Sequence, residues 1–290
     1  MEVGVVLIEM KTYLECIPCF FKQALFAARE ATNDEKMIKR VLDAVASHLP
    51  EIPLDSPPPQ TARFVYGAIR DITGVSDPFK KLKDQSIQAA LQLYPTMKAA
   101  VERSENPLKT AARIAITGNV VDFGAQHHFD LEEEMKTVLQ KPLSIDHFDS
   151  FKRSIEKART VLYLGDNAGE TVFDRILIET IGKKTIYAVR DIPIINDATV
   201  EDAIKSGIDS VAEIMSSGCD APGTILSRCS EEFLDTFRSA DVIISKGQGN
   251  LECLSDEAGP IFYLLKVKCP VITRNLGAPN GGMILKDATI

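Results

Sequence analysis

From residue 160 onward, short apolar runs alternate with segments of helical periodicity, and this alternation limits the fold more than any other feature of the sequence. The apolar runs predict strands at residues 161–164, 185–189, 211–214, 242–245 and 261–267. Helical patterns fill the intervals, near residues 170–181, 199–206, 230–239 and 250–255. Because strands that alternate with helices form βαβ units, the pattern predicts an α/β domain with a mainly parallel sheet. A last segment, residues 269–276, fits either a short helix or a strand.

The first half of the sequence lacks this alternation and predicts a succession of helices instead. Apolar residues recur at helical spacing in the segments 18–32, 34–48, 61–73, 77–102, 108–121, 131–139 and 145–158. Gly74 is expected to end one helix, and Pro95 is expected to break another. Residues 53–59 form a proline-rich connector. We therefore expect a helical N-terminal region over residues 1–158 and an α/β domain over residues 159–290.

The charge and the apolar runs exclude several classes of partner. The chain has 33 basic and 41 acidic residues, a formal net charge of -8, and no long basic run, which argues against nucleic acid. No apolar stretch approaches the ~20 residues that span a bilayer, so a membrane partner is not expected. The N-terminal apolar segment is too short for a signal peptide, which indicates a cytoplasmic protein whose translation starts at Met1 or Met10. A homo-oligomer is compatible with this composition.

The segment Gly165-Asp166-Asn167-Ala-Gly169-Glu170 follows the first predicted strand. Open α/β sheets bind their ligands at the carboxyl ends of their strands, where Asp166 and Asn167 are expected to lie. A carboxylate and an amide offer hard oxygen ligands, which suit Mg²⁺ or Mn²⁺ better than zinc. The alternative is that both residues only cap the following helix.

Polar residues follow other predicted strands as well, and in a parallel sheet these strand ends meet at one edge. Asn196 and Asp197 follow the second strand, and Lys246-Gly-Gln248-Gly-Asn250 follows the fourth. Lys268 follows the fifth.

These residue types are those that phosphoryl chemistry requires. Asp166, Asn167 and Asp197 together could coordinate one divalent ion, which would polarise a phosphoryl oxygen or activate water. Lys246 or Lys268 would neutralise phosphate charge, and Glu170 would serve as a general base or orient the substrate. Taken singly, Asn196 and Asp197 could also be ordinary cap residues.

Two further motifs lie in the helical half. Cys16-x-x-Cys19 opens a helix, where such a pair serves in redox chemistry, in half of a zinc site, or as structural thiols. The six cysteines otherwise have no disulfide pattern and are expected to be free. Asn119 and Asp122 are three residues apart and share a helical face, so they either point at the same site or belong to an ordinary helix end.

Taken together, the motifs resemble the DUF89 family, the metal-dependent damage-control phosphatases related to the protein called acidic residue methyltransferase 1. The resemblance spans residues 12–285 and rests on Cys16-x-x-Cys19-Phe20, Gly118-Asn119-x-x-Asp122, Gly165-Asp166-Asn167-Ala-Gly169-Glu170, Asn196-Asp197-x-Thr199 and Lys246-Gly-x-Gly-Asn250. The Cys-x-x-Cys form is similar to that of the archaeal and bacterial branch.

The resemblance implies a helical region packed on a Rossmann-like domain and a divalent metal (Mg, Mn, Co or Ni) held by Asp166, Asn167 and Asp197. It implies that a small phosphorylated metabolite is hydrolysed. Contacts to the phosphate or the substrate are expected from Asn119, Asp122, Glu170, Asn196, Lys246, Gln248, Asn250 and Lys268. The eukaryotic members have Asp at the position of Gln248, and Lys266 is an alternative to Lys268.

We therefore predict a metal-dependent phosphatase of sugar phosphates or damaged phosphometabolites. Asp166 is either its nucleophile or only a metal ligand. One alternative is a carboxyl methyltransferase that uses S-adenosylmethionine. The other is a non-enzymatic redox or metal-binding module built around Cys16 and Cys19.

Overall fold

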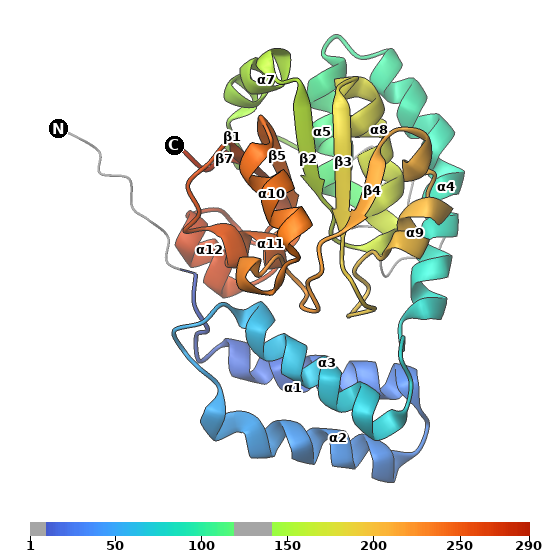
Figure 1. Cartoon of the computed structure of the whole chain (residues 1–290), viewed down its shortest axis with the longest axis vertical. Coiled ribbons are helices and arrows are strands. Elements are labelled where there is room, and N and C mark those ends of the chain that lie inside the picture. The colour runs from blue at the N-terminus through green and yellow to red at the C-terminus, as the bar shows by residue number, and fades with distance from the viewer. Residues whose placement is uncertain (1–9, 119–140) are drawn as a thin grey trace, which may run out of the picture.

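The computed structural model describes residues 10–118 and 141–290, and its centre is a seven-stranded sheet (Figure 1). The strand order is β1-β7-β6-β5-β2-β3-β4. All neighbouring strands are parallel except β6 and β7, which confirms the predicted α/β class and the mainly parallel sheet. The strands are β1 (Ile145–Asp146), β2 (Thr160–Leu164), β3 (Lys184–Val189), β4 (Glu213–Ser216), β5 (Val242–Lys246), β6 (Ile261–Lys266) and β7 (Met283–Asp287).

Both faces of the sheet are covered by helices, which explains why the central strands are continuous apolar runs. In β2, Val161 and Tyr163 pack into the core that contains α4, α5 and α8, whereas Leu162 and Leu164 face α10, α11 and α12 on the other side. The covering helices are α4 (Lys80–Glu102), α5 (Pro107–Thr117), α7 (Phe148–Lys157), α8 (Thr171–Ile181), α9 (Val200–Lys205), α10 (Glu231–Ser239), α11 (Gly247–Leu254) and α12 (Pro270–Leu276).

The helices α1 (Cys16–Ala31), α2 (Glu35–His48) and α3 (Pro58–Thr73) form a separate layer beneath the sheet's carboxyl edge (Figure 1). They have an apolar core of their own, which Ile194 joins from the loop after β3. Asp34 caps α2 through the backbone N–H groups of Lys36 and Met37, and Gly74 ends α3 in the left-handed region, as predicted. This layer therefore stands opposite the ends of the strands.

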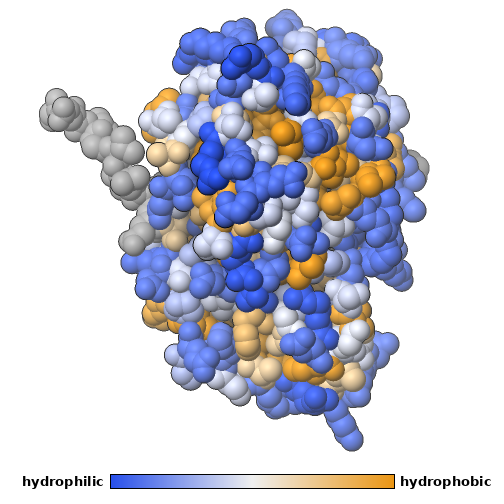
Figure 2. All heavy atoms as spheres, in the orientation of Figure 1, coloured by the Kyte–Doolittle hydropathy of each residue, from blue (hydrophilic) through white to orange (hydrophobic). Residues whose placement is uncertain are grey.

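Other helices of the N-terminal half pack on the sheet instead. Helices α4 and α5 contact α8, and α5 also contacts β6. The division at residues 158 and 159 thus stays a prediction. No helix in the described ranges is both long and apolar enough to cross a membrane. On the face seen in Figure 2, hydrophilic residues predominate and hydrophobic ones form small, separate patches.

Several predicted elements were wrong in detail. Helix α4 continues through Pro95, because residues on both sides of it, among them Ile87 and Met97, are buried in the same core and offset the lost hydrogen bond. The strand expected at 211–214 begins at Glu213, and the helix expected from Ile145 starts only after β1.

The C-terminal part of the sheet also differs from the expectation. The segment that fitted either a helix or a strand is helix α12, which has proline at its first turn and Gly277 as a left-handed C-cap. Strand β7 was not predicted, and it runs antiparallel to β6. The helix expected at 131–139 and the end of the one expected at 108–121 lie outside the described residues.

Candidate active site

The segments after β2 and β3 meet at the carboxyl edge of the sheet. Asn167 and Asp197 pair in an antiparallel bridge. The backbone N–H of Ala198 donates to the Asp166 carbonyl oxygen at 2.7 Å, and that of Ala168 donates to the Asn196 carbonyl oxygen at 2.8 Å. The predicted meeting of these strand ends is therefore confirmed, and it brings Asp197 beside Asp166 and Asn167.

A cleft of about 360 Å³ opens between this edge of the sheet and the layer of α1 and α3. Six of the residues predicted from the sequence line it: Asp166, Asn167, Asn196, Asp197, Gln248 and Lys268. Ile195 also lines it and has a φ of 46°, a left-handed conformation that is strained for a β-branched residue. The chain thus holds a strained turn where it presents Asn196 and Asp197 to the cleft.

The two carboxyl groups at this wall are electrostatically unfavourable without a cation. Burial raises the pKa of Asp166 well above its ordinary value, and the charges of Asp197 and Glu170 raise it further. Burial also raises the pKa of Asp197, although Arg190 acts in the opposite direction. A cation between the two side chains would remove this repulsion.

The donor set fits a hard divalent ion. Asp166, Asn167 and Asp197 provide two carboxylates and one amide oxygen, the chemistry that Mg²⁺ and Mn²⁺ accept. In the parts of the chain that the structure describes, no group of three His, Cys, Asp or Glu side chains is arranged for a metal ion. A site here therefore depends on the amide oxygen of Asn167.

Gly247 makes room for the Asp166 carboxylate. Its φ is +78°, and a Cβ built on it would overlap the carboxyl group of Asp166. We expect Gly247→Ala to lose about 1–2 kcal/mol of stability through the left-handed backbone and roughly 100-fold in activity through displacement of Asp166. Gly182→Ala is the matched control, because Gly182 has a φ of +62° and the structure places no neighbouring side chain or backbone of the described residues within 4 Å of the added Cβ. Equal activity in the two variants, in a phosphate-release assay, would contradict this prediction.

Two residues expected to contact phosphate are buried behind the cleft. The amide nitrogen of Asn250 donates to the carbonyl oxygens of Gly165 (3.2 Å) and Lys246 (2.8 Å), and its oxygen accepts from Arg190 and Thr224. The Lys246 ammonium donates to two carboxylates. Direct phosphate contacts from Asn250 and Lys246 thus stay predictions, and those from Asn119 and Asp122 lie outside the described residues.

Arg190 is a residue of the site that the sequence analysis missed. Its side chain is 2% exposed, and its Nε donates to Asp197 Oδ2 at 2.7 Å. Its other nitrogens donate to Thr224 Oγ1 at 3.2 Å and Asn250 Oδ1 at 3.0 Å. The sequence signal for Arg190 was a positively charged residue directly after the apolar strand β3. This signal does not identify its hydrogen-bond partners, because they come from three separate segments.

Thiols also line the cleft. Cys16, Cys19 and Cys269 belong to its wall, and the described cysteines are all free. Burial raises the pKa of the Cys16 thiol to about 11, so the neutral thiol predominates near pH 7. A reactive or metal-binding cysteine requires the opposite shift.

Comparisons with known proteins identify the family of the chain. The chain belongs to the family described as the damage-control phosphatase ARMT1-like domain, whose model matches residues 12–284. It is 35% identical to a damage-control phosphatase of Pyrococcus horikoshii over 282 residues, 95% of this chain and 97% of the relative. It is 35% identical to a damage-control phosphatase of Archaeoglobus fulgidus over 290 residues, 96% of this chain and 99% of the relative.

A solved structure shows the same fold. A crystal structure of a DUF89 family protein from Pyrococcus horikoshii superimposes with a TM-score of 0.90 at 33% identity. The match covers 96% of this chain and 99% of that one. The predicted DUF89 membership is thus confirmed.

Proposed function

We propose that this protein is a metal-dependent phosphatase that hydrolyses small phosphate esters, such as sugar phosphates or damaged phosphometabolites. The observation that carries the proposal is the pairing of Asn167 with Asp197 beside Asp166 in one cleft. Its volume of about 360 Å³ is at the small end of ligand sites, which span about 300–1,000 Å³. The names of the archaeal relatives support the same reaction class.

Each polar group of the wall has a role in this proposal. Asp166, Asn167 and Asp197 hold the divalent cation, which supplies Lewis-acid polarisation of a phosphoryl oxygen when bound. Lys268 is exposed at the cleft and brings positive charge to the phosphate. Gln248 Oε1 is buried and has no hydrogen-bond partner among the described residues, so it is available to accept from a substrate hydroxyl.

A panel assay tests the proposal. The chelator-treated protein is supplied with Mg²⁺, Mn²⁺, Co²⁺ or Ni²⁺, and phosphate release is measured on a set of phosphomonoesters. We expect hydrolysis that depends on the added cation and is lost again when the chelator is returned. A protein that releases phosphate from no ester with any of the four ions would overturn the proposal.

The relatives' names favour the phosphatase over the two alternatives. A methyltransferase would bind S-adenosylmethionine, which calorimetry detects directly, and we expect no heat of binding. A metal or redox module built on Cys16 and Cys19 would lose its metal in the Cys16→Ser/Cys19→Ser variant. We expect that variant to retain its divalent cation in elemental analysis.

A further inference from the structure

A buried polar network lies behind the cleft, between β2, β3, β5 and α8. Asp174 is completely buried, and its carboxylate accepts from the hydroxyls of Tyr163 (2.7 Å) and Tyr187 (2.8 Å). The ammonium of Lys246, which is 1% exposed, donates to Asp174 Oδ1 at 2.7 Å and to Glu170 Oε2 at 2.8 Å. One cation thus fixes two carboxylates that come from the start of α8 and from the turn before it.

The network reaches the cleft through Asn167. The amide nitrogen of Asn167 donates to Glu170 Oε1 at 2.7 Å and, at the longer distance of 3.3 Å, to Asp166 Oδ2. An ionised carboxylate only accepts hydrogen bonds, so it selects the NH₂ branch of the amide and turns the oxygen branch away from itself. Asn167 lines the cleft, and its amide oxygen is the ligand that the donor set requires.

The surroundings of Glu170 suit this role better than general-base catalysis. Its two oxygens face Asn167 and Lys246, and the residue is 2% exposed. Glu170 also borders a second cavity of about 10 Å³, which holds about one water and no metabolite. The carboxylate is joined to the substrate cleft by its hydrogen bond with Asn167.

We infer that Glu170, anchored by Lys246 and Asp174, is a positioning residue that fixes the amide oxygen of Asn167 as a ligand for the cation. This inference rests on the proposed function. It gives Lys246 the task of holding Glu170, in place of the direct phosphate contact expected from the sequence. Residues that orient metal ligands in this way typically change metal affinity about 10–100-fold when they are removed.

Manganese binding to the chelator-treated protein tests the inference without an activity assay. Titration with Mn²⁺, followed through the paramagnetic resonance signal of the free ion, gives Kd for each variant. We expect Glu170→Ala to raise Kd by roughly 10–100-fold. In Glu170→Gln the new amide oxygen can still accept from Asn167, but its new NH₂ group would face the Lys246 ammonium. We therefore combine it with Lys246→Met, which removes that ammonium. The double variant should bind Mn²⁺ more tightly than Glu170→Ala. A general base would behave differently: Glu170→Ala and Glu170→Gln would bind Mn²⁺ normally and both lose kcat about 10²–10⁴-fold.

A double-mutant cycle shows whether Glu170 acts through Asn167. In an Asn167→Ala background, Glu170→Ala should raise the Mn²⁺ Kd no further, because the amide that Glu170 orients is gone. Glu179→Ala is the matched control: Glu179 lies on α8 and pairs with Lys98 and Arg175 away from the cleft. We expect this control to bind Mn²⁺ like the wild type. Circular dichroism and melting curves establish that each variant folds.

The outcomes separate this inference from the proposed function. A wild-type protein that binds no Mn²⁺ and hydrolyses no ester overturns both. A wild type that binds Mn²⁺, beside a Glu170→Ala variant that binds it equally tightly, overturns the inference alone. If Glu170→Ala raises the Mn²⁺ Kd further in the Asn167→Ala background, the inference is also overturned, because Glu170 would then act by a route other than Asn167.

Discussion

Asp166→Ala should abolish phosphate release while the protein stays folded. The variant removes one of two carboxylates from the proposed cation site, and a Lewis-acid cation contributes several kcal/mol to the transition state. Since each 1.4 kcal/mol corresponds to a factor of ten in rate, the loss in kcat/KM should be at least about 1,000-fold. The measurement is phosphate release at saturating Mn²⁺ on the best ester of the panel.

The same variant should also lose its response to metal in thermal melts. A ligand at 100 times its Kd stabilises the folded state by about 2.7 kcal/mol, so Mn²⁺ should raise the wild-type Tm and leave that of Asp166→Ala almost unchanged. Removal of a carboxylate whose pKa is raised by burial and by Asp197 should not destabilise the metal-free protein. The control is Asp191→Ala, which removes an exposed carboxylate that follows β3 and accepts a hydrogen bond from the Ser216 hydroxyl. Activity in Asp166→Ala equal to that of this control would contradict the cation site.

Part of the candidate site could be predicted from the sequence, because the edge at which parallel strands end depends little on how the side chains pack. Parallel strands present their carboxyl ends at one edge, so the polar residues after β2 and β3 were expected at the same edge of the sheet. They meet because β2 and β3 are also neighbours in the sheet. The bridge between Asn167 and Asp197 and the position of Lys268 at the cleft confirm this reasoning.

The buried cations could not be placed in this way. Lys246 has the sequence context of a phosphate ligand, a strand end followed by glycines, yet it is 1% exposed between Glu170 and Asp174. Asp174 lies on a largely apolar stretch of α8, and only the packed structure shows that two tyrosines and a lysine satisfy it. Partners that come from several segments leave no periodic signal in any one of them.

Prediction of the fold from local sequence pattern has the same limit. Local pattern identified the five strands of the βαβ units, but β7 follows a turn and lies between β6, to which it is antiparallel, and the edge strand β1. No strand–helix alternation precedes β7 that would predict it from the sequence. Pro95 is a helix breaker by local chemistry, and the core contacts on both sides of it decide otherwise. In both cases long-range packing outweighed local preference.

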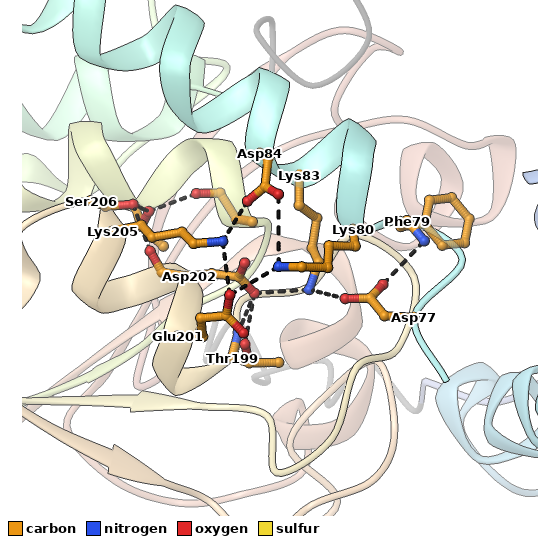
Figure 3. Close-up of polar contacts among 12 residues, drawn as sticks. Asp77, Phe79, Lys80, Lys83, Asp84, Thr199, Glu201, Asp202, Lys205 and Ser206 are labelled. Atoms are coloured by element: carbon orange, nitrogen blue, oxygen red, sulfur yellow. Dashed lines mark hydrogen bonds and ion pairs between the residues drawn. The ribbon is translucent and has the colours of Figure 1, made fainter. Parts of the chain in front are cut away.

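Lys83→Met should destabilise the protein by about 3–5 kcal/mol, the usual effect of removing one partner from a buried ion pair. Lys83 is 3% exposed, and its ammonium contacts Asp77 at 2.7 Å and Asp202 at 2.9 Å (Figure 3). Burial opposes its charge, but Asp202 and Asp77 outweigh burial and raise the pKa of the ammonium. Because the folded pKa is raised, this stabilisation is fully present at pH 7, below the ordinary pKa of lysine of about 10.4, and it is lost as the pH rises through the folded pKa. Urea unfolding at pH 7 measures it.

Lys80→Met provides the matched control on the same helix. Lys80 belongs to the same cluster and pairs with Glu201 at 2.9 Å and Asp84 at 3.7 Å, but its side chain is 53% exposed (Figure 3). Exposed pairs contribute about 0–1 kcal/mol, and salt at 1 M should remove that contribution while leaving the effect of Lys83→Met in place.

Asp202 also accepts from the backbone N–H and hydroxyl of Thr199, two residues after Asp197, so the Lys83 pair joins α4 to the loop of the candidate site. Equal losses of unfolding free energy in Lys83→Met and Lys80→Met would show that the buried Lys83 pair does not hold that loop to α4.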